Sequence, residues 1–174
     1  MMEICERPGQ REQDDLNKAA QDLVEVLDQM KLKISMAESC TGGMAASALV
    51  DIAGASRVFE ESYITYSDRV KHKLLGVSRQ TLDQYTAVSD RTAAEMAEGV
   101  HACTGSDLAI SVTGYAGPED GEDGTPAGTV YIGTWYQNAV QTRCCHFTGD
   151  RNSCRRQAAR SALEFGLERI SRSE

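Results

Sequence analysis

Residues 37–43 constrain the fold of this chain more than any other segment. Their sequence, Ala-Glu-Ser-Cys-Thr-Gly-Gly, lies between a short apolar stretch at residues 33–37 and a run of small residues at 44–50. This order predicts a strand, a polar turn and a helix. Such a turn exposes Ser39 beside the free N–H groups of the new helix, where a nucleophile and an anion-binding site can coexist. The alternative is a purely structural turn that needs glycine and a helix cap.

Helical and strand patterns alternate along most of the chain. Apolar residues recur at helical spacing over about residues 14–30, with Asp14 or Asp15 available as the cap. The further expected helices cover residues 44–50, 67–76, 78–85, 89–103 and 150 to nearly the end. The expected strands cover residues 33–37, 58–65, 108–112, 129–135 and 140–147. The alternation favours a single-domain layered α/β fold, and the final hairpin makes its sheet of about five strands mixed.

Length and charge narrow the class of protein. The 174 residues suffice for one domain, which we expect over residues 14–174 after a polar tail at residues 1–13. The net charge of −8 argues against general nucleic-acid binding but allows a small phosphorylated ligand. No apolar run is long enough to span a membrane, and residues 1–15 lack a signal-peptide core. We therefore expect a cytoplasmic protein with no membrane partner.

The spacing of the cysteines and histidines gives little indication of metal binding or catalysis. None of the 6 cysteines forms a C-x-x-C pair and no acidic or histidine cluster has ligand spacing, so neither a metal nor another cofactor is expected. Cys40 lies in the polar turn and stays open as an alternative nucleophile, although no histidine is close in sequence to activate it. His101 and His146 fit structural or exposed positions, and none of the histidines lies in a Ser-His-Asp pattern.

A lysine is the other base that can activate a serine, provided that burial or neighbouring charge lowers its pKa. Tyr66 ends an expected strand, and Lys71 lies about one turn into the following helix. Both would face Ser39 if the two strands are neighbours. The alternative is a solvated lysine on a basic helix, because Arg69 and other basic residues are close by.

Six sequence motifs occur in a fixed order along the chain. They are residues 37–43 (AESCTGG), 66–77 (YSDRVKHKLLGV), 87–89 (AVS), 113–118 (TGYAGP), 127–131 (AGTVY) and 147–151 (FTGDR). In this order they resemble the CinA C-terminal domain family over about residues 16–170. The chain looks like a stand-alone form, without the N-terminal domain of full-length members. The resemblance implies an amidohydrolase that converts nicotinamide mononucleotide to nicotinic acid mononucleotide and ammonia.

The same resemblance implies roles for individual residues. Ser39 matches the nucleophile of the family, and Tyr66 and Lys71 match the residues that assist it. The residues implied to bind the nucleotide are Thr41, Gly42, Gly43, Thr113, Gly114, Gly117 and Arg151. The N–H groups of the first three would supply either the oxyanion donors or the phosphate site. A small-molecule nucleotide is thus the expected partner, and the sequence also allows a homo-oligomer.

The long glycine-rich loop at residues 114–128 departs from the family pattern. It carries four acids, Glu119, Asp120, Glu122 and Asp123, which replace neutral residues of the family pattern or lie near them. Acidic side chains near a phosphorylated ligand weaken its binding, unless they point to solvent. The loop therefore leaves a second hypothesis open: a catalytically weak or inactive paralogue that binds a nucleotide or a protein partner in a competence- or damage-related role.

Overall fold

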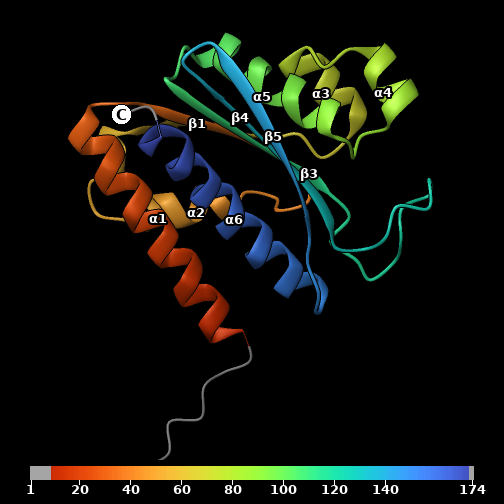
Figure 1. Cartoon of the computed structure of the whole chain (residues 1–174), viewed down its shortest axis with the longest axis horizontal. Helices are drawn as coiled ribbons and strands as arrows, with labels where there is room; N and C mark the ends of the chain where they lie inside the picture. Colours follow the sequence, from red (N-terminus) through yellow and green to blue (C-terminus); the bar gives the residue numbers. More distant parts are fainter. Residues whose placement is uncertain (1–8, 173–174) are drawn as a thin grey trace, which may run out of the picture.

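Five strands form one mixed sheet in the order β2-β1-β3-β4-β5 in the computed structural model, which describes residues 9–172 (Figure 1). β1 (Ile34–Glu38) runs parallel to β2 (Phe59–Ile64) and to β3 (Leu108–Gly114). β4 (Thr129–Tyr136) pairs antiparallel with β3 and with β5 (Ala139–His146). The prediction of an α/β fold with a mixed sheet of about five strands is confirmed.

Helices cover both faces of this sheet (Figure 1). One layer consists of α1 (Gln10–Met30), α2 (Met44–Val50) and α6 (Arg151–Ser171). The other consists of α3 (Asp68–Leu75), α4 (Arg79–Tyr85) and α5 (Asp90–Thr104), and a short 3-10 turn, η1 (Ala55–Arg57), precedes β2. Every residue of β1 is buried because it is central and covered on both faces, whereas β5 at the edge alternates between exposed and partly buried positions.

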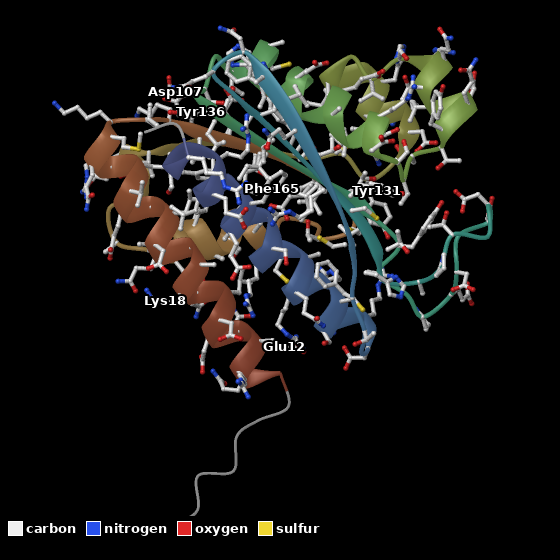
Figure 2. The ribbon with its side chains drawn as sticks, in the orientation of Figure 1. Glu12, Lys18, Asp107, Tyr131, Tyr136 and Phe165 are labelled. Carbon is white, nitrogen blue, oxygen red and sulfur yellow. The ribbon has the colours of Figure 1, made fainter. Side chains whose placement is uncertain are left out.

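The first helix begins earlier than predicted. Its N-cap is Gly9, without a side-chain cap, so neither Asp14 nor Asp15 caps it. Residues 10–13 of the predicted 1–13 tail are therefore helical, and residues 1–8 lie outside the described part of the chain. A tertiary contact explains the extra turn: Glu12, labelled in Figure 2, accepts a hydrogen bond of 2.8 Å from Nε of Arg156 on α6. Local sequence patterns do not reveal such a long-range partner.

Other helix starts agree more closely with the sequence. Ser78, Ser89 and Asp150 each accept a hydrogen bond from a backbone N–H of the helix that follows. Ser67 precedes α3 as expected, but its side chain makes no capping bond. No helix among the described residues is long and apolar enough to cross a membrane.

The strand order brings the carboxyl ends of β2, β1 and β3 together at one end of the sheet. The chain passes from β1 through α2 to β2 on one side, and then through α3, α4 and α5 to β3 on the other side of β1. The carboxyl ends of these parallel strands therefore meet where the direction of winding reverses. In open α/β sheets, ligands bind in the crevice at this position.

A close approach of two helices positions α3 against the sheet layer. A Cβ added at Gly99 of α5 would lie 2.1 Å from the carbonyl oxygen of Leu75, the last residue of α3. Only glycine therefore allows α3 to pack at this distance.

We expect Gly99→Ala to lower the free energy of unfolding by about 1–3 kcal/mol, because the overlap with backbone outweighs the better helix propensity of alanine. Urea unfolding measures this loss. Glu98→Ala, at an exposed position of the same helix, is the matched control and should change stability by less than about 0.5 kcal/mol. Equal stability of the two variants would contradict the role given to this contact.

Candidate active site

Ser39 lies immediately beyond the carboxyl end of β1. Its backbone N–H donates to the carbonyl of Val112 at 2.9 Å, so the residue continues the register of β1 with β3 before the chain turns into α2. The residue is 7% exposed and lines a cavity of about 610 Å³. Ser39 thus lies at a strand-to-helix turn, as the sequence predicted, and this turn lines the cavity.

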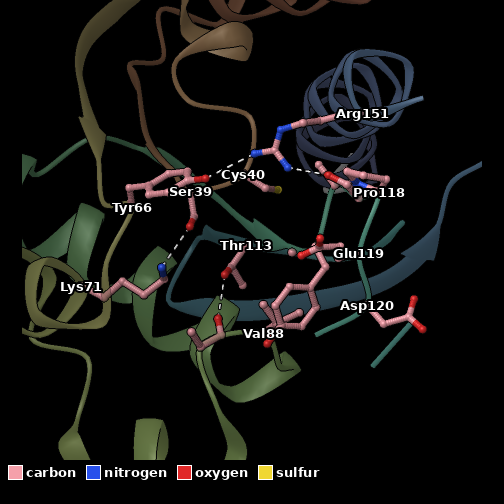
Figure 3. A pocket seen from close by; sticks show the side chains of 15 residues that line it. Ser39, Cys40, Tyr66, Lys71, Val88, Thr113, Pro118, Glu119, Asp120 and Arg151 are labelled. Carbon is pink, nitrogen blue, oxygen red and sulfur yellow. Dashed lines mark hydrogen bonds between the residues drawn. The ribbon is translucent and has the colours of Figure 1, made fainter. Parts of the chain in front are cut away.

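Lys71 on α3 contacts the hydroxyl of Ser39 directly. Its Nζ lies 3.0 Å from Oγ of Ser39 (Figure 3) and 2.9 Å from the carbonyl oxygen of Thr65. The side chain is almost fully buried, with 1% of its surface exposed. Burial lowers the pKa of Lys71, and the negative charge of Asp68 opposes this effect only in part. The structure therefore excludes the alternative of a solvated lysine, and it favours an amine that can give up its proton beside a serine.

Tyr66 and Arg151 form a second polar pair on the wall of this cavity (Figure 3). A guanidinium nitrogen of Arg151 lies 3.3 Å from the hydroxyl of Tyr66, and another donates to the carbonyl oxygen of Gly117 at 2.6 Å. Tyr66 was predicted to converge on Ser39; both residues line this cavity, and the hydroxyl of Tyr66 bonds to Arg151. Because Arg151 is the donor, the hydroxyl proton of Tyr66 remains able to donate to a ligand.

Most of the predicted site residues line the same cavity. They are Ser39, Tyr66, Lys71, Thr113, Gly114, Gly117 and Arg151. Thr113 also holds the segment before α5 at the cavity, because its hydroxyl donates to the carbonyl of Ala87, another lining residue, at 2.6 Å. Within residues 9–172, no three His, Cys, Asp or Glu side chains gather as a candidate metal site.

Thr41, Gly42 and Gly43 are not among the residues that line this cavity. Thr41 is fully buried. The N–H of Gly42 donates to the carbonyl of Ser39, and the N–H of Gly43 donates to the carboxylate of Glu38. The prediction of free N–H donors is therefore wrong for Gly42 and Gly43, whose N–H groups have internal partners.

Glu38 is the residue in this motif whose importance the sequence did not indicate. Its carboxylate is completely buried and accepts hydrogen bonds from the backbone N–H groups of Gly43, Ala45 and Ala46, at 3.0, 3.2 and 2.8 Å. It therefore occupies the N-terminus of α2, where a negative charge is stabilised. An acidic residue directly before a strand-to-helix turn is the signal that could have revealed it.

Arg155 on α6 holds the same turn from the other side. Its guanidinium donates to the carbonyl oxygens of Cys40 at 3.1 Å and Thr41 at 2.8 Å. The turn is thus fixed through its N–H groups by Glu38 and through its carbonyls by Arg155. No sequence spacing connects these residues, because they lie far apart along the chain.

Comparison with known proteins agrees with this architecture. The chain matches the CinA C-terminal domain over residues 16–170. The chain belongs to the CinA C-terminal domain family.

Individual members of the CinA family show how far the similarity reaches. A nicotinamide-nucleotide amidohydrolase from Enterobacter agglomerans is 47% identical over 135 residues, which cover 77% of this chain and 82% of that protein. A CinA-like protein from Kosmotoga olearia is 45% identical over 143 residues, 82% of this chain but 35% of the relative, so this chain spans about a third of its length. A crystal structure of a CinA superfamily protein from Klebsiella pneumoniae superposes with a TM-score of 0.88 at 36% identity, covering 90% of this chain and 98% of that one.

Cys40 does not have the properties of a nucleophile in this CinA domain. The thiol is buried, and burial raises its pKa to about 12. The reactive thiolate is therefore scarce at neutral pH, even though Lys71 and two backbone N–H groups oppose the shift. The histidines also lie elsewhere: His72 and His101 bond to the carbonyls of Val77 and Ser106. Ser39 is the candidate nucleophile that has an amine, that of Lys71, within hydrogen-bond distance.

The four acids of the loop at residues 114–128 occupy different environments. Glu119 and Asp120 line the cavity, whereas Glu122 and Asp123 do not. The carboxylate of Asp120 accepts from the N–H of Ala127 at 2.8 Å, and that of Asp123 accepts from the N–H of Thr125 at 2.9 Å. Two of the acids, Asp120 and Asp123, thus stabilise the loop itself, while Glu119 and Asp120 present their negative charges to the cavity.

Removal of the Glu38 carboxylate should destabilise the protein, because Glu38→Ala leaves the start of α2 without its acceptor. We expect a loss of about 1.5–3 kcal/mol in the free energy of unfolding, as for hydrogen bonds to a charged group. Glu60→Ala, at an exposed position of neighbouring β2, is the control. Denaturant midpoints test the difference, and coincident midpoints for the two variants would refute it.

Proposed function

We propose that this protein hydrolyses the carboxamide of nicotinamide mononucleotide, releasing nicotinic acid mononucleotide and ammonia. The observation that carries the proposal is the buried amine of Lys71, 3.0 Å from the hydroxyl of Ser39 at the base of a cavity. The family contains a relative named nicotinamide-nucleotide amidohydrolase, of which this chain covers 82%. Amide hydrolysis needs a nucleophile, a proton carrier and a donor for the oxyanion, and this cavity offers a candidate for each.

The first chemical step joins Ser39 to the substrate. Neutral Lys71 accepts the hydroxyl proton while Oγ of Ser39 attacks the carboxamide carbon, and the carbonyl electrons move to the oxygen. The hydroxyl of Tyr66, held by Arg151, is the side-chain donor available to the developing oxyanion.

The second step expels ammonia and restores the enzyme. The protonated Lys71 returns its proton to the departing nitrogen as the carbon–nitrogen bond breaks, which leaves an ester on Ser39. Water then attacks this ester with Lys71 again as the base, releasing the carboxylate product and the free hydroxyl. One lysine thus acts as base and acid in alternation.

Arg151 is the cation suited to the phosphate of the nucleotide. Lys71 and Arg151 are the cations among the residues that line the cavity, and Lys71 is committed to Ser39 and Thr65. Arg151 is exposed and presents a guanidinium, whose planar donors match phosphate oxygens.

Replacement of the nucleophile provides the main test of the proposal. We expect Ser39→Ala to lower the turnover number by roughly 10⁴-fold or more while largely sparing nucleotide affinity, because the nucleophile acts mainly in the transition state. Ammonia release gives the rate, and calorimetric titration gives the affinity. Ser67→Ala, at an exposed position before α3, should remain active. If the wild type releases no more ammonia than Ser39→Ala, the protein is the nucleotide-binding or partner-binding paralogue instead.

The pH dependence of the reaction tests the role of Lys71. The pKa of Lys71 is lowered by burial, so its neutral fraction at a given pH exceeds that of an ordinary lysine. We expect kcat/KM to increase with pH through one deprotonation and to level off below the ordinary lysine pKa of about 10.4. Lys71→Met should remove both the activity and this rise. A profile that is flat across neutral and alkaline pH would exclude Lys71 as the base.

A further inference from the structure

The proposed substrate carries two opposite charges, and the inference below depends on that proposed function. Its ribose-linked pyridine nitrogen makes the ring a cation, while the phosphate is an anion. Because Ser39 must reach the carboxamide on the ring, the ring itself has to lie in the cavity near Ser39. The residues facing it there therefore meet a positive charge.

The wall contributed by the loop at residues 114–128 is acidic and aromatic. Tyr115, Glu119 and Asp120 all line the cavity that contains Ser39 and Lys71. Figure 3 shows Glu119 on the side of the cavity opposite Lys71. An aromatic ring and a carboxylate are the groups that recognise organic cations.

Glu119 differs from the other acids of this loop. Asp120 and Asp123 accept backbone hydrogen bonds within the loop, and Glu122 lies outside the cavity lining. In the described part of the chain, no hydrogen bond or ion pair engages the carboxylate of Glu119. Its charge is therefore available to a ligand.

Negatively charged groups also surround Tyr115. Burial raises the pKa of its hydroxyl, and the nearby carboxylates of Asp123, Asp68 and Glu122 raise it further. A field that disfavours a phenolate favours a cation at the same place. The aromatic face of Tyr115 is thus positioned in a region that attracts positive charge.

We propose that Glu119 and Tyr115 form a cation-recognising wall that makes this site select the positively charged pyridinium ring over a neutral ring of the same shape. The acids of the loop then help to determine specificity and do not merely repel the phosphate. Specificity of this kind is a difference between two affinities, so it can be measured as a ratio.

The experiment compares two ligands with the same phosphate. In the Ser39→Ala protein, calorimetry measures the dissociation constants of nicotinamide mononucleotide and of its reduced, neutral dihydropyridine form. Any effect of Glu119 on the phosphate is shared by the two ligands and cancels in the ratio. We expect added Glu119→Gln to reduce the preference for the oxidised form about two- to fivefold, as for a solvent-accessible ion pair, with a smaller reduction at high salt. Tyr115→Leu should lower the same ratio.

Glu122→Gln is the matched control, since it removes one charge from the same loop outside the cavity lining. It should change the ratio less than Glu119→Gln does, because Glu122 acts on the ring only from outside the cavity lining. An unchanged ratio in Glu119→Gln, an equal change in Glu122→Gln, or no binding of either ligand would overturn the proposal. If the wild type turns over the substrate but Glu119→Gln leaves the ratio of affinities unaltered, only this inference is rejected. Binding with the expected ratio but no turnover would reject only the proposed reaction.

Discussion

The carboxylate of Glu38 is the contact on which the candidate site depends. A fully buried carboxylate is costly unless donors surround it, and the first N–H groups of α2 are unpaired within their own helix. The carboxylate and these N–H groups therefore satisfy each other's hydrogen bonds, and this pairing fixes the direction in which α2 leaves β1. The turn between them has no freedom left to place Ser39 elsewhere, and Arg155 holds its carbonyls from α6.

Lys71 gives the site its chemistry at a cost to stability. Its amine bonds to a hydroxyl and a carbonyl rather than to a carboxylate, so the buried charge lacks direct compensation. Because its pKa is lower in the folded state, the unfolded chain binds more protons between the folded and the ordinary pKa. The contribution of Lys71 to stability is therefore least favourable at low pH and improves as pH rises through the lowered pKa.

The sequence predicted those parts that follow from local patterns or from the family motifs. Hydrophobic periodicity located the elements to within a few residues, and the motifs brought Ser39, Lys71 and Arg151 to one cavity. It did not predict what depends on distant partners. The early start of α1 beside Arg156, the hydrogen bond from Arg151 to Tyr66, and the occupation of the helix N-terminus by Glu38 arise from tertiary packing, which no short spacing encodes.

The meeting of three strand ends has a consequence for how function arises during folding. The residues around the cavity come from the turn after β1, the segment from β2 into α3, the loop before α5, the end of β3 with the loop after it, and the start of α6. They therefore extend from residue 39 to residue 151. No contiguous fragment shorter than this span contains them, and their parallel pairings are contacts of long sequence separation. The reactivity of the site thus depends on the complete sheet. The proposed base, Lys71, meets Ser39 only when the chain has crossed from β1 to β2 and continued into α3. The site therefore becomes reactive only after these strands have paired.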